Sequence, residues 1–167
     1  MSKQIYLLDG HSLAHRAFYA LPLLSNSEGE YTNAVFGFSR MLFKLIDDKD
    51  PDLIAVAFDK EAPTFRHQEF EDYKANRKEM PEELQPQINL VKQVVEAMRI
   101  PIFEIEGYEA DDVIGTLARK AEKEGMEVNI VTGDRDALQL VTDNVNVIYT
   151  KKGITNIVKY DLDKVKD

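Results

Sequence analysis

The sequence contains no cysteine and few histidines, and these absences exclude several kinds of site. Without cysteine the chain forms no disulfide and offers no thiolate metal ligand or cysteine nucleophile. Its three histidines, at positions 11, 15 and 67, lack the spacing of a zinc site. The glycine-rich phosphate loop, the G-x-G-x-x-G motif and the nucleophile elbow are also missing. The candidate functional residues are therefore carboxylates and basic residues.

Long hydrophobic runs are absent as well. No stretch approaches the roughly 20 apolar residues that a membrane span requires. The first apolar run is interrupted by Asp9, which is too early for a signal peptide. We therefore expect a soluble, cytoplasmic protein with no membrane partner. At 167 residues, with an ordinary apolar fraction, the chain suits a single domain covering 1–167.

The chain is acidic, with a net charge of −9 and a pI near 4.9. Taken over the whole molecule, this balance argues against nucleic-acid binding, which usually shows a basic footprint. Acidic residues gathered in a metal site would, however, be neutralised by the ions that they bind. The arrangement of the acidic residues therefore matters more than their sum.

Three short apolar runs, each typical of a buried strand, end in aspartate. Asp9 follows residues 5–8, Asp59 follows residues 53–58, and Asp134 and Asp136 follow residues 128–131. In a parallel α/β sheet the carboxyl ends of the strands face one crevice, where ligands bind. We therefore expect these carboxylates to converge.

A further acidic group, Glu109, Asp111 and Asp112, opens an expected helix over 109–124. Taken singly, such residues are more often helix caps or turn residues than ligands. Seven carboxylates at four strand or helix ends reverse that balance, because like charges packed together raise each other's pKa and need compensation. Clustered oxygen ligands suit hard cations, which predicts Mg²⁺ or Mn²⁺.

The remaining patterns alternate between strands and helices. Strands are expected near residues 4–8, 53–58, 101–105, 127–131, 145–149 and 155–158, and helices near 12–20, 34–48, 81–99, 109–124 and 135–141, with another beginning near 161. Ser12 is expected to cap the first helix. The order indicates an α/β fold with a mostly parallel central sheet flanked by helices, Rossmann-like and three-layered, with right-handed crossovers.

Residues 60–83 form a second informative region, because they are polar and follow Asp59 directly. Basic residues there are interleaved with aromatic ones: Lys60, Phe65, Arg66, His67, Phe70, Tyr73, Lys74, Arg77 and Lys78. Such a mixture can bind phosphates and stack bases. A solvated surface helix is the alternative, since acidic residues, among them Glu69, Glu71, Asp72 and Glu79, dilute the charge. The position after Asp59 favours a segment that lies over the acidic crevice.

Five stretches of the sequence closely resemble the 5′-nuclease (flap-endonuclease) family with its PIN-like fold, which includes the N-terminal domain of bacterial DNA polymerase I. They span nearly the whole chain in order: LDGHSLAHRAFYAL (8–21), TNAVFGF (32–38), AFDKEAPTFRHQEFEDYKANR (57–77), GYEADDVIGTLA (107–118) and VTGDRDALQLV (131–141).

The resemblance implies a 5′-3′ exonuclease and 5′-flap endonuclease that cuts DNA phosphodiesters with two divalent ions. Its expected roles are RNA-primer and flap removal in replication and repair, in the bacterial cytoplasm, with a polymerase attached in a longer protein. The implied metal ligands are Asp9, Asp59, Glu109 and Asp111 for the first ion, Asp134 and Asp136 for the second, and Asp112 as a further motif member. Asp111 would lie between the two ions.

The resemblance also assigns residues 62–83 to a helical arch beside which the 5′ strand passes. Lys74 and Arg77 would act on the scissile phosphate as catalytic residues, and Tyr73 would stack a displaced base. The full set of implied DNA contacts is Thr32, Asn33, Arg66, Tyr73, Lys74, Arg77 and Lys78.

The family continues into a helix–three-turn–helix region that this sequence, ending at Asp167, lacks. We therefore expect a fragment whose second metal site is incomplete and whose duplex binding is weak. Two alternatives remain: a PIN-type ribonuclease, which the extended Tyr-Lys-Ala-Asn-Arg arch disfavours, and a non-catalytic fragment that binds metal or DNA.

Overall fold

A computed structural model describes residues 3–60, 80–152, 156–161 and 163–164. Its core is one six-stranded sheet in the order β3-β2-β1-β4-β5-β6. The strands are β1 (Gln4–Asp9), β2 (Leu53–Ala57), β3 (Ile102–Phe103), β4 (Glu127–Thr132), β5 (Val145–Lys152) and β6 (Asn156–Tyr160). All neighbouring pairs are parallel except β5 with β6. The predicted mostly parallel sheet is thus confirmed.

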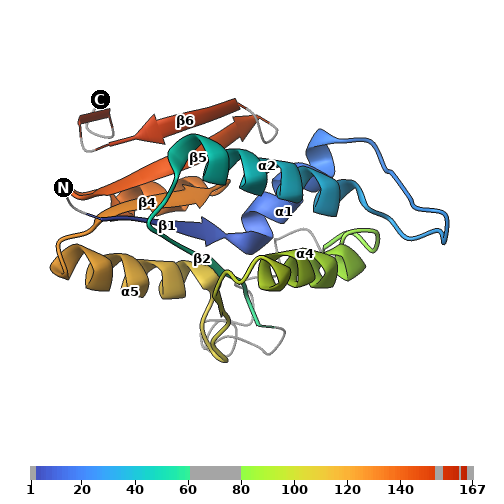
Figure 1. The fold of residues 1–167 in the computed structure, drawn as a ribbon, viewed down its shortest axis with the longest axis horizontal. Coiled ribbons are helices and arrows are strands. Elements are labelled where there is room, and N and C mark those ends of the chain that lie inside the picture. Colours follow the sequence, from blue (N-terminus) through green and yellow to red (C-terminus); the bar gives the residue numbers. More distant parts are fainter. Residues whose placement is uncertain (1–2, 61–79, 153–155, 162, 165–167) are drawn as a thin grey trace.

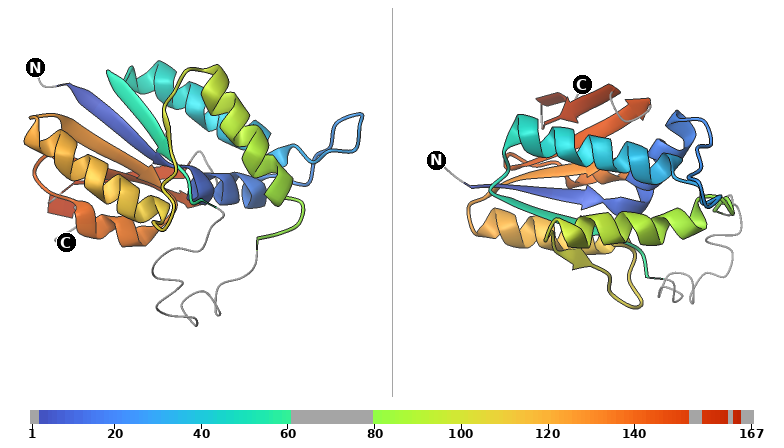
Figure 2. Two further views of the ribbon diagram at one scale, coloured as in Figure 1. Left: turned by 90° about the horizontal axis from the view of Figure 1, so that it is seen from below. Right: turned by 45° about the vertical axis from the view of Figure 1, so that its right-hand side comes forward.

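Helices cover both faces of this sheet (Figures 1 and 2). The helices α1 (Gly10–Ala20), α2 (Asn33–Lys49) and α4 (Gln85–Ala97) lie on one face, while α5 (Ala110–Lys123) and the 3₁₀ helix η1 (Arg135–Leu140) lie on the other. In β1, Tyr6 and Leu8 pack into the first layer and Leu7 into the second, as the two-residue period of a strand requires. The three-layer prediction is confirmed.

Several boundaries differ from the sequence expectations. The helix expected from residue 81 begins at Gln85, after a turn in which Leu84 N–H donates to Pro81 O at 3.0 Å. Pro86 explains this start, because proline has no N–H to donate and fits only the first turn of a helix. The expected strand 101–105 is confined to Ile102–Phe103.

The helix expected over 135–141 is a 3₁₀ helix of six residues. So short a segment gains little from α-helical nucleation and adopts the tighter turn. Near the end of the chain, residues 163 and 164 are helical and Lys164 N–H donates to Asp161 Oδ1 at 2.9 Å, in keeping with a helix that begins near Asp161.

A buried polar contact joins α2 to α4. The side chain of Gln87 is fully buried; its Oε1 accepts from Ala34 N–H at 2.7 Å and its Nε2 donates to Asn33 Oδ1 at 2.9 Å. Backbone N–H groups of a first helical turn lack partners within the helix, so Gln87 satisfies a requirement of α2. The contact fixes α4 against the start of α2.

In the part of the chain that the structure describes, no helix is long and apolar enough to span a membrane.

Candidate metal centre

The expected carboxylates lie at the carboxyl edge of the sheet, around β1. Asp9 is the last residue of β1, and β2 and β4 flank that strand in parallel. Asp59 follows the end of β2, and Asp134 follows the end of β4. The chain runs from β1 to β2 through α1 and α2 on one face of the sheet, and from β3 to β4 through α5 on the other face. The direction of the strand order therefore changes at β1, and this edge is the switch point at which such sheets bind ligands.

Asp9 is buried at the centre of the site, with 5% of its surface exposed. It is the N-cap of α1 and accepts hydrogen bonds from Ser12 N–H at 3.3 Å and from Thr132 Oγ1 at 3.1 Å. Burial raises its pKa to about 6, and the charge of Asp59 adds to the effect. The prediction that Ser12 caps α1 was wrong, because the Asp9 carboxylate takes that role while Ser12 Oγ accepts from Gly133 N–H at 3.0 Å.

Asp111 shows most directly that the carboxylates converge. Burial raises its pKa to about 7, and four other charges raise it further. They are, from the largest effect, Asp9, Asp134, Asp59 and Glu109. Five of the seven expected ligands, drawn from four separate segments, therefore lie close enough to repel one another.

Glu109 and Asp112 are placed by the first turn of α5. Glu109 is the N-cap, with 4% of its surface exposed, and Asp112 Oδ2 accepts from Glu109 N–H at 3.1 Å. The two residues form a capping box, in which each side chain accepts from the backbone N–H of the other residue. Asp112 thus has a structural role, and its service as a ligand stays a prediction.

Asp59 is anchored through both its backbone and its side chain. Its Oδ1 accepts from Ala110 N–H at 2.6 Å, and its own N–H donates to His11 Nδ1 at 3.0 Å. Sequence reasoning missed His11, which has no spacing that identifies it. Its partner is 48 residues away, and burial lowers the pKa of the imidazole.

Gly10 is the reason that this contact fits. A Cβ at Gly10 would lie 2.3 Å from Phe58 Cε1, closer than any real contact. Only glycine allows the end of β2 to approach the start of α1 so tightly. The approach brings His11 to the backbone of Asp59.

Asp134 and Asp136 belong to the turn that leaves β4. Asp134 Oδ1 accepts from Asp136 N–H at 2.9 Å and caps η1. Arg16 donates to Gly133 O at 3.2 Å and to Tyr149 Oη at 2.9 Å, which holds the turn against α1 and β5. Asp136 is exposed and lines the groove described next.

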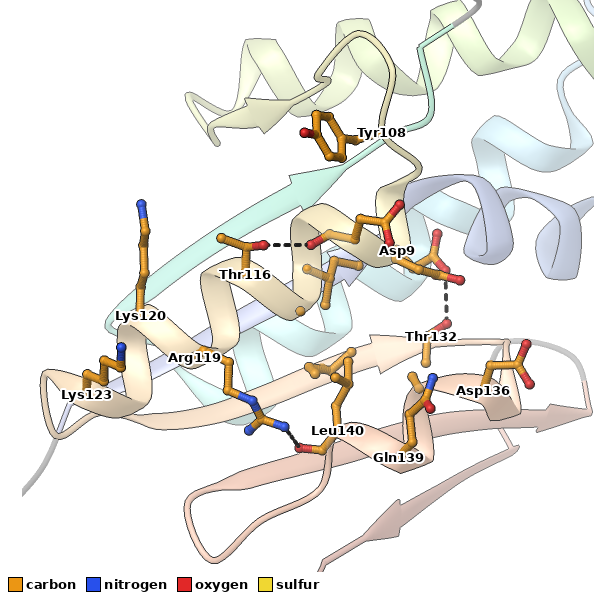
Figure 3. Close-up of a pocket in the computed structure, with 16 residues that line it drawn as sticks. Asp9, Tyr108, Thr116, Arg119, Lys120, Lys123, Thr132, Asp136, Gln139 and Leu140 are labelled. Carbon is orange, nitrogen blue, oxygen red and sulfur yellow. Dashed lines mark hydrogen bonds between the residues drawn. The ribbon is translucent and has the colours of Figure 1, made fainter. Parts of the chain in front are cut away.

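A groove of about 710 Å³ runs from the carboxylates along α5, between this helix and η1 (Figure 3). At one end it is lined by Asp9, Asp111 and Asp136, and further along by Lys120 and Lys123. Figure 3 shows the Thr132 hydroxyl bound to Asp9 at the base of the groove. The site is therefore open to a large ligand.

The donor set fits a hard cation in its chemistry. Every expected ligand is a carboxylate, and raised pKa values at Asp9 and Asp111 are what a nearby positive charge would relieve. Among the described residues, however, no three acidic or histidine side chains already share one coordination sphere. Ser12, Thr132 and Ala110 each donate to one carboxylate oxygen of Asp9 or Asp59, and because such an oxygen has two lone pairs it can keep this hydrogen bond while it binds an ion.

Comparison with known proteins identifies the family. The family described as "5′-3′ exonuclease, N-terminal resolvase-like domain" matches residues 4–167. The chain belongs to this exonuclease family.

Its relatives within the family are long polymerases. The chain is 50% identical to DNA polymerase I of Bacillus caldotenax over 167 residues, which is 100% of the chain and 19% of that protein. It is 48% identical to DNA polymerase I of Bacillus subtilis (strain 168) over 165 residues, 99% of the chain and 19% of that protein. The chain thus spans about a fifth of the length of these relatives.

Solved structures confirm the fold of the exonuclease family. The bacteriophage T5 D15 protein co-crystallised with metal ions has a TM-score of 0.69 and 23% identity, covering 96% of this chain and 57% of that one. The catalytic core of Rad2 in complex with a DNA substrate has a TM-score of 0.54 and 16% identity, covering 98% of this chain and 49% of that one.

Two of the expected DNA contacts of this exonuclease-family chain are described. Asn33 was expected to touch DNA, but its side chain is fully buried and its Nδ2 donates to Phe18 O at 2.9 Å, so that expectation is corrected. Thr32 is half-buried and its hydroxyl donates to Leu24 O at 3.4 Å; its contact with DNA stays a prediction. The arch contacts Arg66, Tyr73, Lys74, Arg77 and Lys78 lie outside the described residues.

Proposed function

We propose that this chain hydrolyses DNA phosphodiesters at the base of a 5′ flap or near a 5′ end, using divalent Mg²⁺ or Mn²⁺. The observation that carries the proposal is the electrostatic convergence on Asp111 of carboxylates from β1, β2, α5 and the turn after β4. Membership of the 5′-3′ exonuclease family supports the same reaction. The biological roles that follow are removal of flaps and RNA primers.

The proposed ligand set divides around Asp111. Asp9, Asp59 and Glu109 would hold the first ion together with Asp111, and Asp134 and Asp136 would hold the second. When bound, such ions lower the pKa of water and stabilise the attacking and leaving oxygens. Asp111 is proposed to lie between the two groups, and the support is that charges from both, Asp9, Asp59 and Glu109 on one side and Asp134 on the other, raise its pKa.

The other residues of the site position these ligands. Thr132 and Ser12 fix Asp9, Ala110 N–H fixes Asp59, and the first turn of α5 fixes Glu109. Lys74 and Arg77 are proposed to hold the scissile phosphate and to stabilise the charge that develops on it. The open groove leaves room for a strand to reach the carboxylates.

The deciding experiment is a cleavage assay on end-labelled 5′-flap DNA with Mg²⁺ or Mn²⁺. We expect the protein to cut the DNA at the flap junction. Chelation of the metal and the substitution Asp9→Asn should each abolish this cleavage. Single-stranded RNA serves as the competing substrate, and Asp47→Asn, an exposed acidic residue on α2, as the control variant. Preferential cutting of RNA would support the ribonuclease. Metal-dependent DNA binding without turnover would support a non-catalytic fragment, and cleavage in excess chelator would refute the metal mechanism.

We further propose that the chain works within a longer protein that carries a polymerase. The support is the 50% and 48% identity to proteins named DNA polymerase I, of which the chain matches about a fifth. An immunoblot of the source cells tests this, because the proposal requires a band several times larger than 19.1 kDa.

A further inference from the structure

His11 makes an unusual contact for a residue in the first turn of a helix. Its Nδ1 lies 3.0 Å from the backbone nitrogen of Asp59. A backbone N–H can only donate, so Nδ1 must be the acceptor and the ring proton lies on Nε2. The bond joins the start of α1 to the residue that follows β2, across 48 positions of sequence.

The imidazole is held in this orientation from several sides. It stands edge-on to Phe58, with ring centroids 5.5 Å apart and an interplanar angle of 76°, and its side chain is 16% exposed. Phe58 is itself fully buried, and Lys92 Nζ lies 5.3 Å from its ring centroid. Lys92 is paired with Glu104 at 2.8 Å. The ring is therefore packed against a buried, well-contacted neighbour while its Nδ1 accepts from Asp59 N–H.

Asp59 is consequently fixed at two points. His11 holds its backbone, and Ala110 N–H, at the start of α5, holds its Oδ1 at 2.6 Å. Without His11, Asp59 would lose its backbone hydrogen bond and keep the side-chain bond to Ala110 N–H, while Phe58 N–H would still donate to Phe103 O at 3.0 Å. We propose that His11 is a positioning residue, which fixes the Asp59 carboxylate for a divalent ion at the proposed metal centre. This inference rests on the proposed function.

The effect of His11 on metal binding should be large. Removal of a residue that orients a metal ligand typically lowers the metal affinity about 10–100-fold. His11→Leu removes the acceptor and keeps an apolar group against Phe58. His11→Asn keeps an acceptor, because its Oδ1 occupies the position of Nδ1. His15 is the matched control: it is another α1 histidine, and its Nδ1 lies 2.9 Å from His11 O, with no hydrogen bond to Asp59 among the described residues.

The first measurement needs neither metal nor turnover. In ¹⁵N-labelled protein in chelator, an N–H···N bond gives a scalar coupling between the Asp59 amide nitrogen and His11 Nδ1. We expect that coupling in the wild type and in His15→Gln. Its absence from the wild type, with both signals assigned, would overturn the proposal.

The second measurement is Mn²⁺ affinity by calorimetry on folded proteins. We expect His11→Leu to bind about 10-fold more weakly or worse, and His11→Asn and His15→Gln to stay within about threefold of the wild type. Wild-type affinity in His11→Leu, or an Asn variant as weak as Leu, would refute the positioning role. If the wild type itself binds no Mn²⁺, it is the proposed metal centre that fails, and the coupling still reports on the geometry.

Discussion

At the scale of single residues, Asp111 carries the electrostatic cost of the site. Its pKa is raised to about 7 by burial and then by four neighbouring carboxylates. Near neutral pH and without an ion, a substantial fraction of the molecules therefore keep a proton on Asp111. A cation binds the ionised form, so metal binding should release protons at this pH.

Asp111→Asn should raise the melting temperature in chelator at pH 8. The raised pKa means that the folded state favours protonated Asp111: its contribution to stability is complete below the ordinary value of 3.8 and is lost as the pH rises through about 7. The gain from the substitution should therefore shrink on going from pH 8 to pH 5. Mn²⁺ should stabilise the variant less than the wild type, because a ligand that binds only the folded state acts by mass action.

Thermal melts at both pH values, with and without Mn²⁺, provide the measurement. Asp47→Asn, on the exposed side of α2, is the control for removing one negative charge from a chain of net charge −9. If Asp111 only begins a helix, its loss costs about 0.3–1 kcal/mol of dipole interaction. A lower melting temperature with an unchanged metal shift would show that case.

At the scale of helices, α4 is fixed to α2 by one buried amide. Gln87 bridges Asn33 and the backbone N–H of Ala34, and all three groups are buried. Each of these groups needs a partner, because an unsatisfied buried polar group costs about 1–3 kcal/mol.

Gln87→Ala should lower the free energy of unfolding by about 2–4 kcal/mol, since it leaves buried groups unsatisfied and opens a cavity. Urea denaturation measures the change. Gln93→Ala, on the exposed side of the same helix, should change the stability by less than about 0.5 kcal/mol. Equal effects of the two substitutions would show that the bridge contributes nothing.

The arch residues give a second prediction at this scale. Lys74→Ala and Arg77→Ala should each slow flap cleavage by about 10²–10³, the usual loss when one transition-state contact to the reacting group is removed. Melting temperatures should stay close to that of the wild type. Lys44→Ala, an exposed residue of α2, is the control. Single-turnover cleavage rates provide the measurement. If both variants cleave at the wild-type rate, Lys74 and Arg77 do not contact the scissile phosphate in the transition state.

Local patterns in the sequence predicted the helices and strands, whereas the roles of several site residues depend on contacts between distant positions of the chain. The strands that precede Asp9, Asp59 and Asp134 follow from their apolar runs, and so does the convergence of their carboxylates. The role of His11 does not follow, because it depends on a partner 48 residues away. The burial of Asn33 does not follow either, because its side-chain oxygen accepts a hydrogen bond from Gln87, 54 residues further along the chain.

At the scale of the whole molecule, the net charge of −9 opposes a polyanionic substrate. Bound divalent ions would reverse the sign of the field where it matters, at the carboxyl edge of the sheet. Binding of DNA should therefore depend on the ion even when no bond is cut, and simple screening by salt should not replace the ion.

Fluorescence anisotropy of labelled 5′-flap DNA in Ca²⁺ and in chelator, at equal ionic strength, tests this dependence. We expect about a tenfold or greater gain in affinity with Ca²⁺ for the wild type and for Asp47→Asn, and a smaller gain for Asp111→Asn. Equal affinity in chelator would mean that the carboxylates take no part in binding DNA.

The pairing of β1 with β4 has a consequence for how the protein is made. Gln4 lies opposite Glu127, so β1 cannot pair with β4 until 123 further residues have been synthesised. At about 5–20 residues per second, a ribosome needs on the order of ten seconds to deliver it. During that interval β1 has an open edge and Asp9 lacks Thr132 and Asp134, which come with β4 or after it. The nascent chain therefore cannot assemble its carboxylate centre until β4 has been synthesised and has left the ribosome, and it should acquire the power to cut nucleic acid only after that point.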